Sequence, residues 1–374
     1  MKKYLLLLTM LLAGGHLFAQ SAKEMTLKDA FKGKFHMGTA MSLQQISGED
    51  AANIDIIKSN FDAIVAENCM KSMYLQPKEG EFNFADADKF VAFGEKNEMW
   101  ITGHCLIWHS QLPRWFFTDE KGDTVSAETL KARMKSHIST VVGRYKGRIK
   151  GWDVVNEAIM EDGSYRKSKF YQILGEEFIP LAFQYAQEAD PQAELYYNDY
   201  NEWYPGKRAT IIQLIKKLKE RGIRIDAIGM QGHVGMDGPS IEEYEQAILD
   251  YTQAGVKVMV TEFDLSILPA PRRGIGADIS NTFEYRKEIN PYTESVPDSA
   301  SVAWTSRMTD FFRLFLTYPG KVSRVTMWGV SDGVSWKNDF PVRGRTDYPL
   351  LFDRQYKAKP VVNDIIRLSQ TDNE

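Results

Sequence analysis

Short apolar runs rich in strand-forming residues alternate with helical segments along the 374-residue chain, and this alternation leaves few folds open. Eight such runs are present, at residues 35–40, 61–68, 100–104, 151–157, 194–201, 226–231, 257–264 and 323–329. The helical segments show their own period, as in residues 207–221, where four apolar side chains share one face, namely Ile211, Leu214, Ile215 and Leu218. Because strands that alternate with helices usually pair in parallel, the sequence predicts an α/β fold, a single (β/α)8 TIM barrel.

An open, doubly wound α/β sheet is the alternative for the same alternation. Such sheets commonly hold phosphates with a glycine-rich turn after a strand, and no such fingerprint is present in this sequence. No linker, low-complexity segment or tandem repeat divides the chain. We therefore expect residues 21–374 to form one barrel domain. A loop rich in Pro, Gly and Asn spans residues 267–300, and loops of this length are usually functional or mobile.

Residues 1–20 have the pattern of a secretory signal peptide. Lys2 and Lys3 precede an apolar core at residues 5–12, and the small residue Ala19 follows. We expect cleavage near residues 19–21 and export to the periplasm or the extracellular space. The apolar core is too short to span a membrane, and we expect no membrane anchor. Loss of the two lysines changes the net charge from −4 to −6, and a negative charge does not suggest a nucleic-acid partner. We also expect a monomer.

The two cysteines, Cys69 and Cys105, are too few for a disulfide framework or a zinc cluster. An exported protein could oxidise this pair to a single disulfide. We expect instead two buried, reduced thiols. We also expect neither a metal nor a cofactor.

Several of the eight runs carry carboxylates at their ends, and two of these carboxylates stand out as a possible pair. Glu157 closes the run 151–157, and Glu262 lies near the end of the run 257–264. The carboxyl ends of barrel strands meet at one face, where barrel enzymes carry their active sites. The two glutamates could therefore face each other across one cleft, where paired carboxylates in different surroundings divide acid and nucleophile roles. Taken singly, each glutamate could equally be a surface or salt-bridged carboxylate.

Five motifs at the ends of these runs together resemble glycoside hydrolase family 10, a family of endo-1,4-β-xylanases. They occupy residues 103–104 with 108–113, 152–157, 231–233, 261–264 and 326–329. Each motif alone is a modest signal, but their order and their positions at strand ends are specific. The resemblance covers about residues 27–370. It implies a (β/α)8 barrel that hydrolyses xylan and xylo-oligosaccharides without a cofactor.

The resemblance implies that Glu157 is the general acid/base and Glu262 the nucleophile of a retaining mechanism. Such a mechanism places the two carboxyl groups about 5–5.5 Å apart. We expect repulsion from ionised Glu262 to raise the pKa of Glu157 and keep it protonated. His233 would hold Glu262 in position, and Asp264 would share that network. Asn156 would bind the sugar 2-hydroxyl, and a bulge at the strand end would turn Asn156 and Glu157 to the same side.

The resemblance also implies a set of sugar-binding side chains around these glutamates. On the glycone side they are Glu67, Asn68, Lys71, His104, Trp108, Gln111, Trp328 and Trp336. The expected binding residues also include Gln231 and His233, and Tyr200 and Asn201 would lie on the leaving-group side. Trp328 would crowd, together with Trp336, the space that a hydroxymethyl group needs, which favours xylose over glucose.

The chain departs from the family pattern at one place. The family usually carries Trp-Glu after the lysine that corresponds to Lys71, whereas Ser72 and Met73 follow it here. We expect this change to reshape a distal glycone subsite without touching the two glutamates.

Three other functions are open on sequence grounds. A retaining cellulase or a mixed-specificity glycosidase on the same barrel would share the two glutamates, but Trp328 and Trp336 argue against it. A non-catalytic polysaccharide-binding protein would not need the pair of carboxylates. A purely structural exported barrel would have no reason to gather His, Trp, Gln and Glu at one face.

Overall fold

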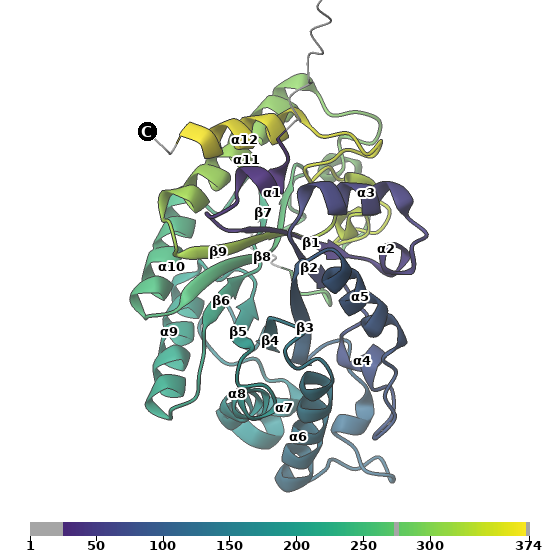
Figure 1. Ribbon diagram of the computed structural model, residues 1–374, viewed down its shortest axis with the longest axis vertical. Coiled ribbons are helices and arrows are strands. Elements are labelled where there is room, and N and C mark those ends of the chain that lie inside the picture. Colours follow the sequence, from purple (N-terminus) through teal and green to yellow (C-terminus); the bar gives the residue numbers. More distant parts are fainter. Residues whose placement is uncertain (1–24, 273–276, 372–374) are drawn as a thin grey trace, which may run out of the picture.

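Eight parallel strands close into a barrel (Figure 1), which confirms the predicted fold. The computed structural model describes residues 25–272 and 277–371, so the predicted signal peptide at 1–20 lies outside the described residues. The barrel strands are β1 (His36–Met41), β2 (Ala63–Ala66), β3 (Trp100–Trp108), β4 (Gly151–Asn156), β5 (Glu194–Asp199), β6 (Ala227–Met230), β8 (Lys257–Ser266) and β9 (Val322–Met327). β1 pairs with both β2 and β9, and β6 pairs with β8, which closes the ring. The carboxyl ends of all eight strands therefore open at one face.

A ninth strand, β7 (His233–Gly235), was not expected from the sequence. It follows β6 after two residues and pairs in parallel with β8, where His233 stands opposite Asp264. Gly232, just before it, has a φ of 76°, and a Cβ there would lie 2.9 Å from the side chain of Val260. Glycine is therefore required at this turn. The turn and the short strand place His233 directly beside the strand that carries Glu262.

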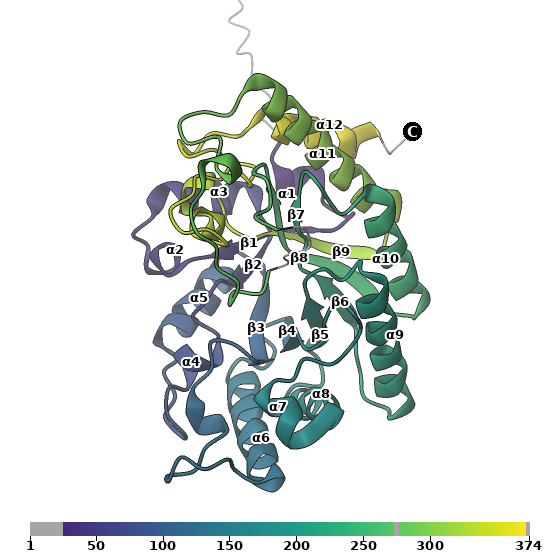
Figure 2. The ribbon, with the colours of Figure 1, turned by 180° about the vertical axis from the view of Figure 1, so that it is seen from behind.

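Helices cover the outside of the barrel, and α9 and α10 lie side by side on the flank opposite α5 (Figures 1 and 2). Among the described helices, none is both long and apolar enough to cross a membrane. The α-helices are α1 (Leu27–Ala30), α2 (Leu43–Ser47), α3 (Ala51–Asn60), α4 (Ser72–Leu75), α5 (Ala85–Lys96), α6 (Ala127–Arg144), α7 (Lys169–Leu174), α8 (Phe178–Ala189), α9 (Pro205–Glu220), α10 (Ile241–Gln253), α11 (Asp298–Thr317) and α12 (Pro360–Thr371). Short 3-10 helices span Arg114–Phe116, Gly175–Glu177, Lys287–Ile289, Asp332–Val334 and Trp336–Asn338.

Two glycines let large aromatic rings fill the space between neighbouring strands. A Cβ at Gly103 of β3 would lie 2.1 Å from the ring of Trp152 in β4. A Cβ at Gly151 of β4 would lie 2.1 Å from the hydroxyl of Tyr196 in β5. Because both aromatic side chains are fully buried, neither ring can move aside cheaply. Glycine inside these strands therefore marks a packing requirement and not a weak strand.

Both cysteines are free and buried, as expected from the sequence. Burial raises the pKa of Cys69 to about 12. Burial also raises the pKa of Cys105 well above its ordinary value. Each side chain is therefore a thiol at neutral pH, and it packs as a small apolar group.

Candidate active site

Glu157 directly follows β4 and has a left-handed backbone, with a φ of 57°. Its N–H donates to the carbonyl oxygen of Asn198 on β5 (2.9 Å). The register of β4 against β5 shifts between Asp153 and Val155, so the predicted irregularity is present a few residues before the glutamate. The amide of Asn156 donates to Glu157 Oε1 (3.2 Å), which shows that the two neighbouring side chains lie on the same side.

The carboxyl group of Glu157 is buried among hydrogen-bond donors. Trp108 Nε1 donates to its Oε2 (2.8 Å), and Gln231 Nε2 donates to its Oε1 (3.1 Å). Burial is the largest cause that raises the pKa of Glu157, to about 7, and the charges of Asp199 and Glu262 add to it. Repulsion from Glu262 therefore raises the pKa of Glu157 as expected, but burial, which was not foreseen, is the larger cause. Removal from water penalises the charged form more than either neighbouring carboxylate does.

Glu262 lies in β8 and is held at both carboxylate oxygens. Asn198 Nδ2 donates to Oε1 (2.8 Å), and His233 Nε2 lies 3.1 Å from Oε2. Burial alone would raise the pKa of Glu262, but the hydrogen bond from His233, the charges of His104 and His233, and the amide of Asn198 outweigh it. The net effect lowers the pKa of Glu262. The two glutamates are thus shifted in opposite directions.

His233 stands between two carboxylates. Its Nδ1 lies 3.0 Å from Asp264 Oδ2, opposite the contact of Nε2 with Glu262, and Trp336 Nε1 also donates to Asp264 Oδ2 (2.8 Å). Burial would lower the pKa of His233, but the charge and hydrogen bond of Asp264 and the hydrogen bond to Glu262 raise it to about 9. The ring is therefore a cation at neutral pH that donates to both acids. Within residues 25–272 and 277–371, no three His, Cys, Asp or Glu side chains are arranged to hold a metal ion.

Asn198, which was not predicted from the sequence, joins the two glutamates through a chain of amides. Its Nδ2 donates both to Glu262 Oε1 and to Asn156 Oδ1 (2.9 Å), and Asn156 in turn donates to Glu157. Thr261 Oγ1 donates to Asn198 Oδ1 (2.6 Å), which fixes the orientation of the amide. Asn198 lies near the end of a strand, like Asn156, and this position was the available signal.

The predicted glycone residues that follow β2 and β3 also come together. Lys71 Nζ donates to Asn68 Oδ1 (2.9 Å) and to Gln111 Oε1 (2.7 Å), and it lies 5.0 Å from the centre of the Trp108 ring. Burial raises the pKa of Glu67, and the charge of Lys71 opposes that rise. Glu67, Asn68, Lys71 and Gln111 therefore form one polar group beside Trp108.

Ser72 and Met73, which differ from the family pattern, are the first two residues of α4. Ser72 is buried, and its hydroxyl donates to the carbonyl oxygen of Leu106 (3.3 Å) and lies 3.3 Å from His137 Nε2. The Met73 side chain is 41% exposed. Ser72 is therefore an interior residue. Of the two, only Met73 is exposed, so the predicted change in a distal subsite would come from Met73.

His104, Trp328 and Trp336 belong to a second group of side chains, which is linked by ring contacts. His104 Nδ1 lies 2.9 Å from Asp153 Oδ2, and the His104 ring meets Trp328 edge to face with centres 5.5 Å apart. The centres of the Trp336 and His233 rings lie 4.9 Å apart, so this group of side chains is continuous with the group around Glu262. Asp153 was not expected from the sequence, although it precedes Glu157 by four residues in the same motif.

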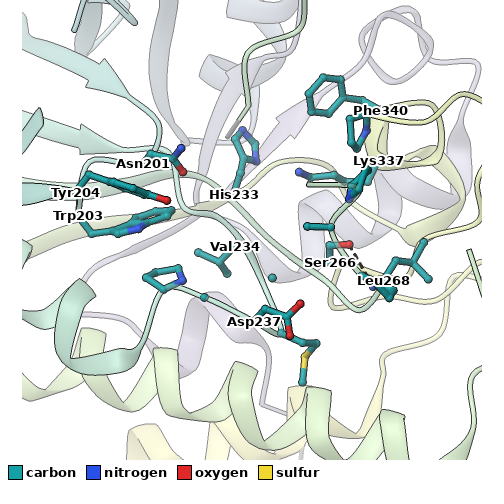
Figure 3. A pocket seen from close by; sticks show the side chains of 18 of the residues that line it. Asn201, Trp203, Tyr204, His233, Val234, Asp237, Ser266, Leu268, Lys337 and Phe340 are labelled. Atoms are coloured by element: carbon teal, nitrogen blue, oxygen red, sulfur yellow. Dashed lines mark hydrogen bonds between the residues drawn. The ribbon is translucent and has the colours of Figure 1, made fainter. Parts of the chain in front are cut away.

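A cavity of about 870 Å³ adjoins His233. Figure 3 shows Asn201 and Tyr204 on one side of it and Lys337 on the other, with His233 between them. Tyr200 is buried and is not among the residues that line this cavity, and its hydroxyl accepts from Arg166 (2.7 Å). Of these residues, Tyr200 and Asn201 were predicted, whereas the aromatic lining residues Trp203, Tyr204 and Phe340 and the cation Lys337 were not.

Comparison with known proteins places this geometry in a family. Residues 26–368 match the model of glycosyl hydrolase family 10. The chain is 48% identical over 350 residues to endo-1,4-beta-xylanase A of Xylanibacter ruminicola, covering 94% of this chain and 95% of that protein. It is 39% identical to an endo-1,4-beta-xylanase of Geobacillus stearothermophilus, covering 92% and 98%. A GH10 endoxylanase retrieved from a sugarcane soil metagenome superposes with a TM-score of 0.87 at 44% identity, covering 92% of this chain and 99% of the other.

Proposed function

The chain belongs to glycosyl hydrolase family 10, and we propose that it is an endo-1,4-β-xylanase that cleaves internal bonds of xylan with retention of configuration. One observation carries the proposal. Two buried glutamates, Glu157 directly after β4 and Glu262 within β8, have pKa values shifted in opposite directions, to about 7 for Glu157 and below the ordinary value for Glu262. At neutral pH one is substantially protonated and the other is ionised, which is the division of roles that glycoside cleavage requires.

In the first step the ionised Glu262 attacks the anomeric carbon and forms a glycosyl ester. Glu157 gives its proton to the leaving glycosidic oxygen, so that the departing sugar leaves as a neutral alcohol. This retaining geometry requires the two carboxyl groups to be about 5–5.5 Å apart. The amides of Asn156 and Asn198 link the two acids and would hold that spacing.

In the second step water cleaves the ester. Esterified Glu262 no longer carries a charge, so one cause of the raised pKa of Glu157 disappears, although burial persists. Glu157, now a carboxylate, takes a proton from water as the water attacks the same anomeric carbon. The two inversions together retain the configuration. His233 remains beside Glu262 and stabilises the carboxylate that is released.

The glycone sugars would bind in the space between two groups of side chains. The polar group of Glu67, Asn68, Lys71 and Gln111 suits sugar hydroxyls, and Asn156 would bind the 2-hydroxyl of the sugar that reacts. His104, Trp108, Gln231 and His233 surround the two acids and would complete the contacts.

Selection of xylose over glucose would come from Trp328 and Trp336. Trp328 is only 7% exposed, and Trp336 is fixed by its hydrogen bond to Asp264. Neither ring can move aside for a hydroxymethyl group without losing these contacts. A steric clash would therefore weaken binding of glucose units more than binding of xylose units. On the leaving-group side, Tyr200 and Asn201 would contact the sugar that departs.

Export is a further part of the proposal, and it rests on the pattern of residues 1–20. We expect the mature protein to be a monomer that acts in the periplasm or outside the cell. Amino-terminal sequencing of protein recovered from the periplasm and from the medium tests this directly. A mature protein that begins at Met1 would contradict export by cleavage.

Product analysis on xylan and on a soluble cellulose tests the activity. Wild-type protein should release short xylo-oligomers from xylan and leave the cellulose intact, and E262A should release nothing. Turnover of the cellulose as well would show that Trp328 and Trp336 do not exclude glucose and would favour a mixed-specificity glycosidase. Failure of the wild-type protein on both polymers would favour a non-catalytic polysaccharide-binding protein.

A further inference from the structure

We propose that Arg166 is a positioning residue for Glu157, and that Asp278 in the loop between β8 and α11 holds Arg166 in place. The inference rests on the proposed function, in which Glu157 protonates the leaving oxygen. It concerns how the acid is aimed.

The backbone of Glu157 needs support on both sides. A left-handed φ of 57° is unfavourable for a residue with a Cβ and persists only where the surroundings hold it. The N–H of Glu157 is held by Asn198, and its carbonyl oxygen accepts from Arg166 Nε (2.9 Å). The chain returns to this point by a short hairpin, in which Arg166 N–H donates to the carbonyl oxygen of Ala158 (2.8 Å). Arg166 therefore fastens the peptide unit that directs the acid.

The guanidinium group reaches three separate elements at once. Nε contacts the end of β4 at Glu157, one terminal nitrogen donates to Tyr200 Oη (2.7 Å), and the other donates to Asp278 Oδ2 (2.8 Å). The Arg166 side chain is only 13% exposed. The planar fork of arginine makes such a set of divergent contacts, whereas the single ammonium group of lysine has no equivalent geometry. In the proposed function Tyr200 contacts the departing sugar, so Arg166 links the acid to the place where that sugar would bind.

Asp278 is set up to receive Arg166. Its Oδ1 accepts from the N–H (3.0 Å) and the hydroxyl (2.6 Å) of Ser280, which leaves Oδ2 for the guanidinium group. Burial would raise the pKa of Asp278, but the hydrogen bonds from Ser280 and the contact with Arg166 hold it at about 2. The carboxylate stays ionised throughout the pH range in which the protein would work. The loop that leaves the strand of Glu262 thus supports the residue that aims Glu157.

Loss of this support has a consequence that depends on the leaving group. A misdirected acid slows the departure of an alcohol, which must be protonated as it leaves. It has little effect on dinitrophenolate, which is stable as an anion and leaves without a proton. General structural damage would lower kcat/KM for both substrates by a similar factor. The ratio of the two rates therefore separates positioning of the acid from structural damage.

The test compares kcat/KM for xylotetraose and for 2,4-dinitrophenyl β-xylobioside in R166M, R166K, D278N and E157A. For R166M we expect a loss of about tenfold or more on xylotetraose and less than about threefold on the aryl glycoside. R166K should lie between R166M and the wild type, and D278N should shift the ratio in the same direction by a smaller factor. R133M is the matched control, because Arg133 is also 13% exposed and pairs with Glu79 (2.6 Å).

Equal losses on the two substrates in R166M, or a ratio no different from that of R133M, would overturn the inference. Should R166M not fold, as judged by its melting temperature, D278N decides alone: an unchanged ratio there counts against the proposal. E157A separates the two claims. It should itself lose xylotetraose activity and keep aryl glycoside activity in kcat/KM. If it does not, the acid role of Glu157 fails and this inference fails with it. If E157A discriminates and the Arg166 variants do not, only this inference fails.

Discussion

Replacement of Asp264 by asparagine should strongly lower the pKa of His233. Asp264 is fully buried, and its Oδ2 accepts from His233 (3.0 Å) and from Trp336 (2.8 Å). Asparagine has nearly the same shape, so D264N removes a charge while it leaves the packing in place. The imidazolium of His233 then keeps only Glu262 as a charged partner in direct contact.

The magnitude follows from the pKa of His233, which is about 9 against an ordinary value of 6.5. This difference is worth roughly 3 kcal/mol. Asp264 is the largest of the causes that raise the pKa. A hydrogen bond to a charged group contributes about 1.5–3 kcal/mol. Loss of the charge-assisted bond between His233 and the Asp264 carboxylate should therefore lower the pKa of His233 by about one to two units.

The same shift makes stability depend on pH. Because the pKa of His233 is raised in the folded protein, its contribution to the free energy of unfolding is fully present below about pH 6.5. It is lost as the pH rises through about 9. The stability gap between wild type and D264N should therefore narrow over this window.

The assay is an NMR titration of the histidine side chains in wild type and D264N, with the His233 signals identified by their absence in H233N. His137 serves as an internal control, because burial alone lowers its pKa to about 4, and D264N should leave that value unchanged. A pKa of His233 that stays near 9 in D264N would refute the account of how Glu262 is kept ionised.

Two further outcomes follow from the structure. In the proposed mechanism Glu157 acts in its protonated form, and its pKa is about 7, so kcat/KM should fall as the pH rises through about 7. W108F, which removes the donor to Glu157 Oε2, should move this alkaline limb upward by about one unit or more, and an unchanged or lowered limb would contradict this. G103A should destabilise the fold by about 1–3 kcal/mol, because its Cβ would meet the Trp152 ring at 2.1 Å, whereas G143A in α6 meets no atom within 4 Å and should be neutral or slightly stabilising in thermal unfolding.

The barrel fold and the position of both glutamates at its open face could be predicted from the sequence, because these features depend on local patterns. The strand runs alternate with helices, and a carboxylate at the end of a parallel strand lies at the open face whatever the rest of the chain does. The boundaries were less accurate. The predicted run 61–68 contains only the four-residue strand Ala63–Ala66, whereas β3 continues to Trp108, four residues beyond the predicted run 100–104.

The features that sequence reasoning missed are long-range. Arg166 and Asp278 are 112 residues apart, and no local pattern pairs them. Asn198 links the two acids only because β5 lies next to β4 in the barrel. The main cause of the raised pKa of Glu157 was missed for the same reason, since burial is a property of the packed molecule and not of the motif.

The most direct test of the central claim is to trap the covalent intermediate. A 2-deoxy-2-fluoro-β-xylobioside with a good leaving group forms the glycosyl ester but releases it slowly, so the label accumulates on the nucleophile. After proteolysis, mass spectrometry should find the fluoroxylobiosyl group on the peptide that contains Glu262, and specifically on that side chain. A label on another residue, or full turnover of xylan by a protein that never becomes labelled, would contradict the double-displacement mechanism proposed for Glu157 and Glu262.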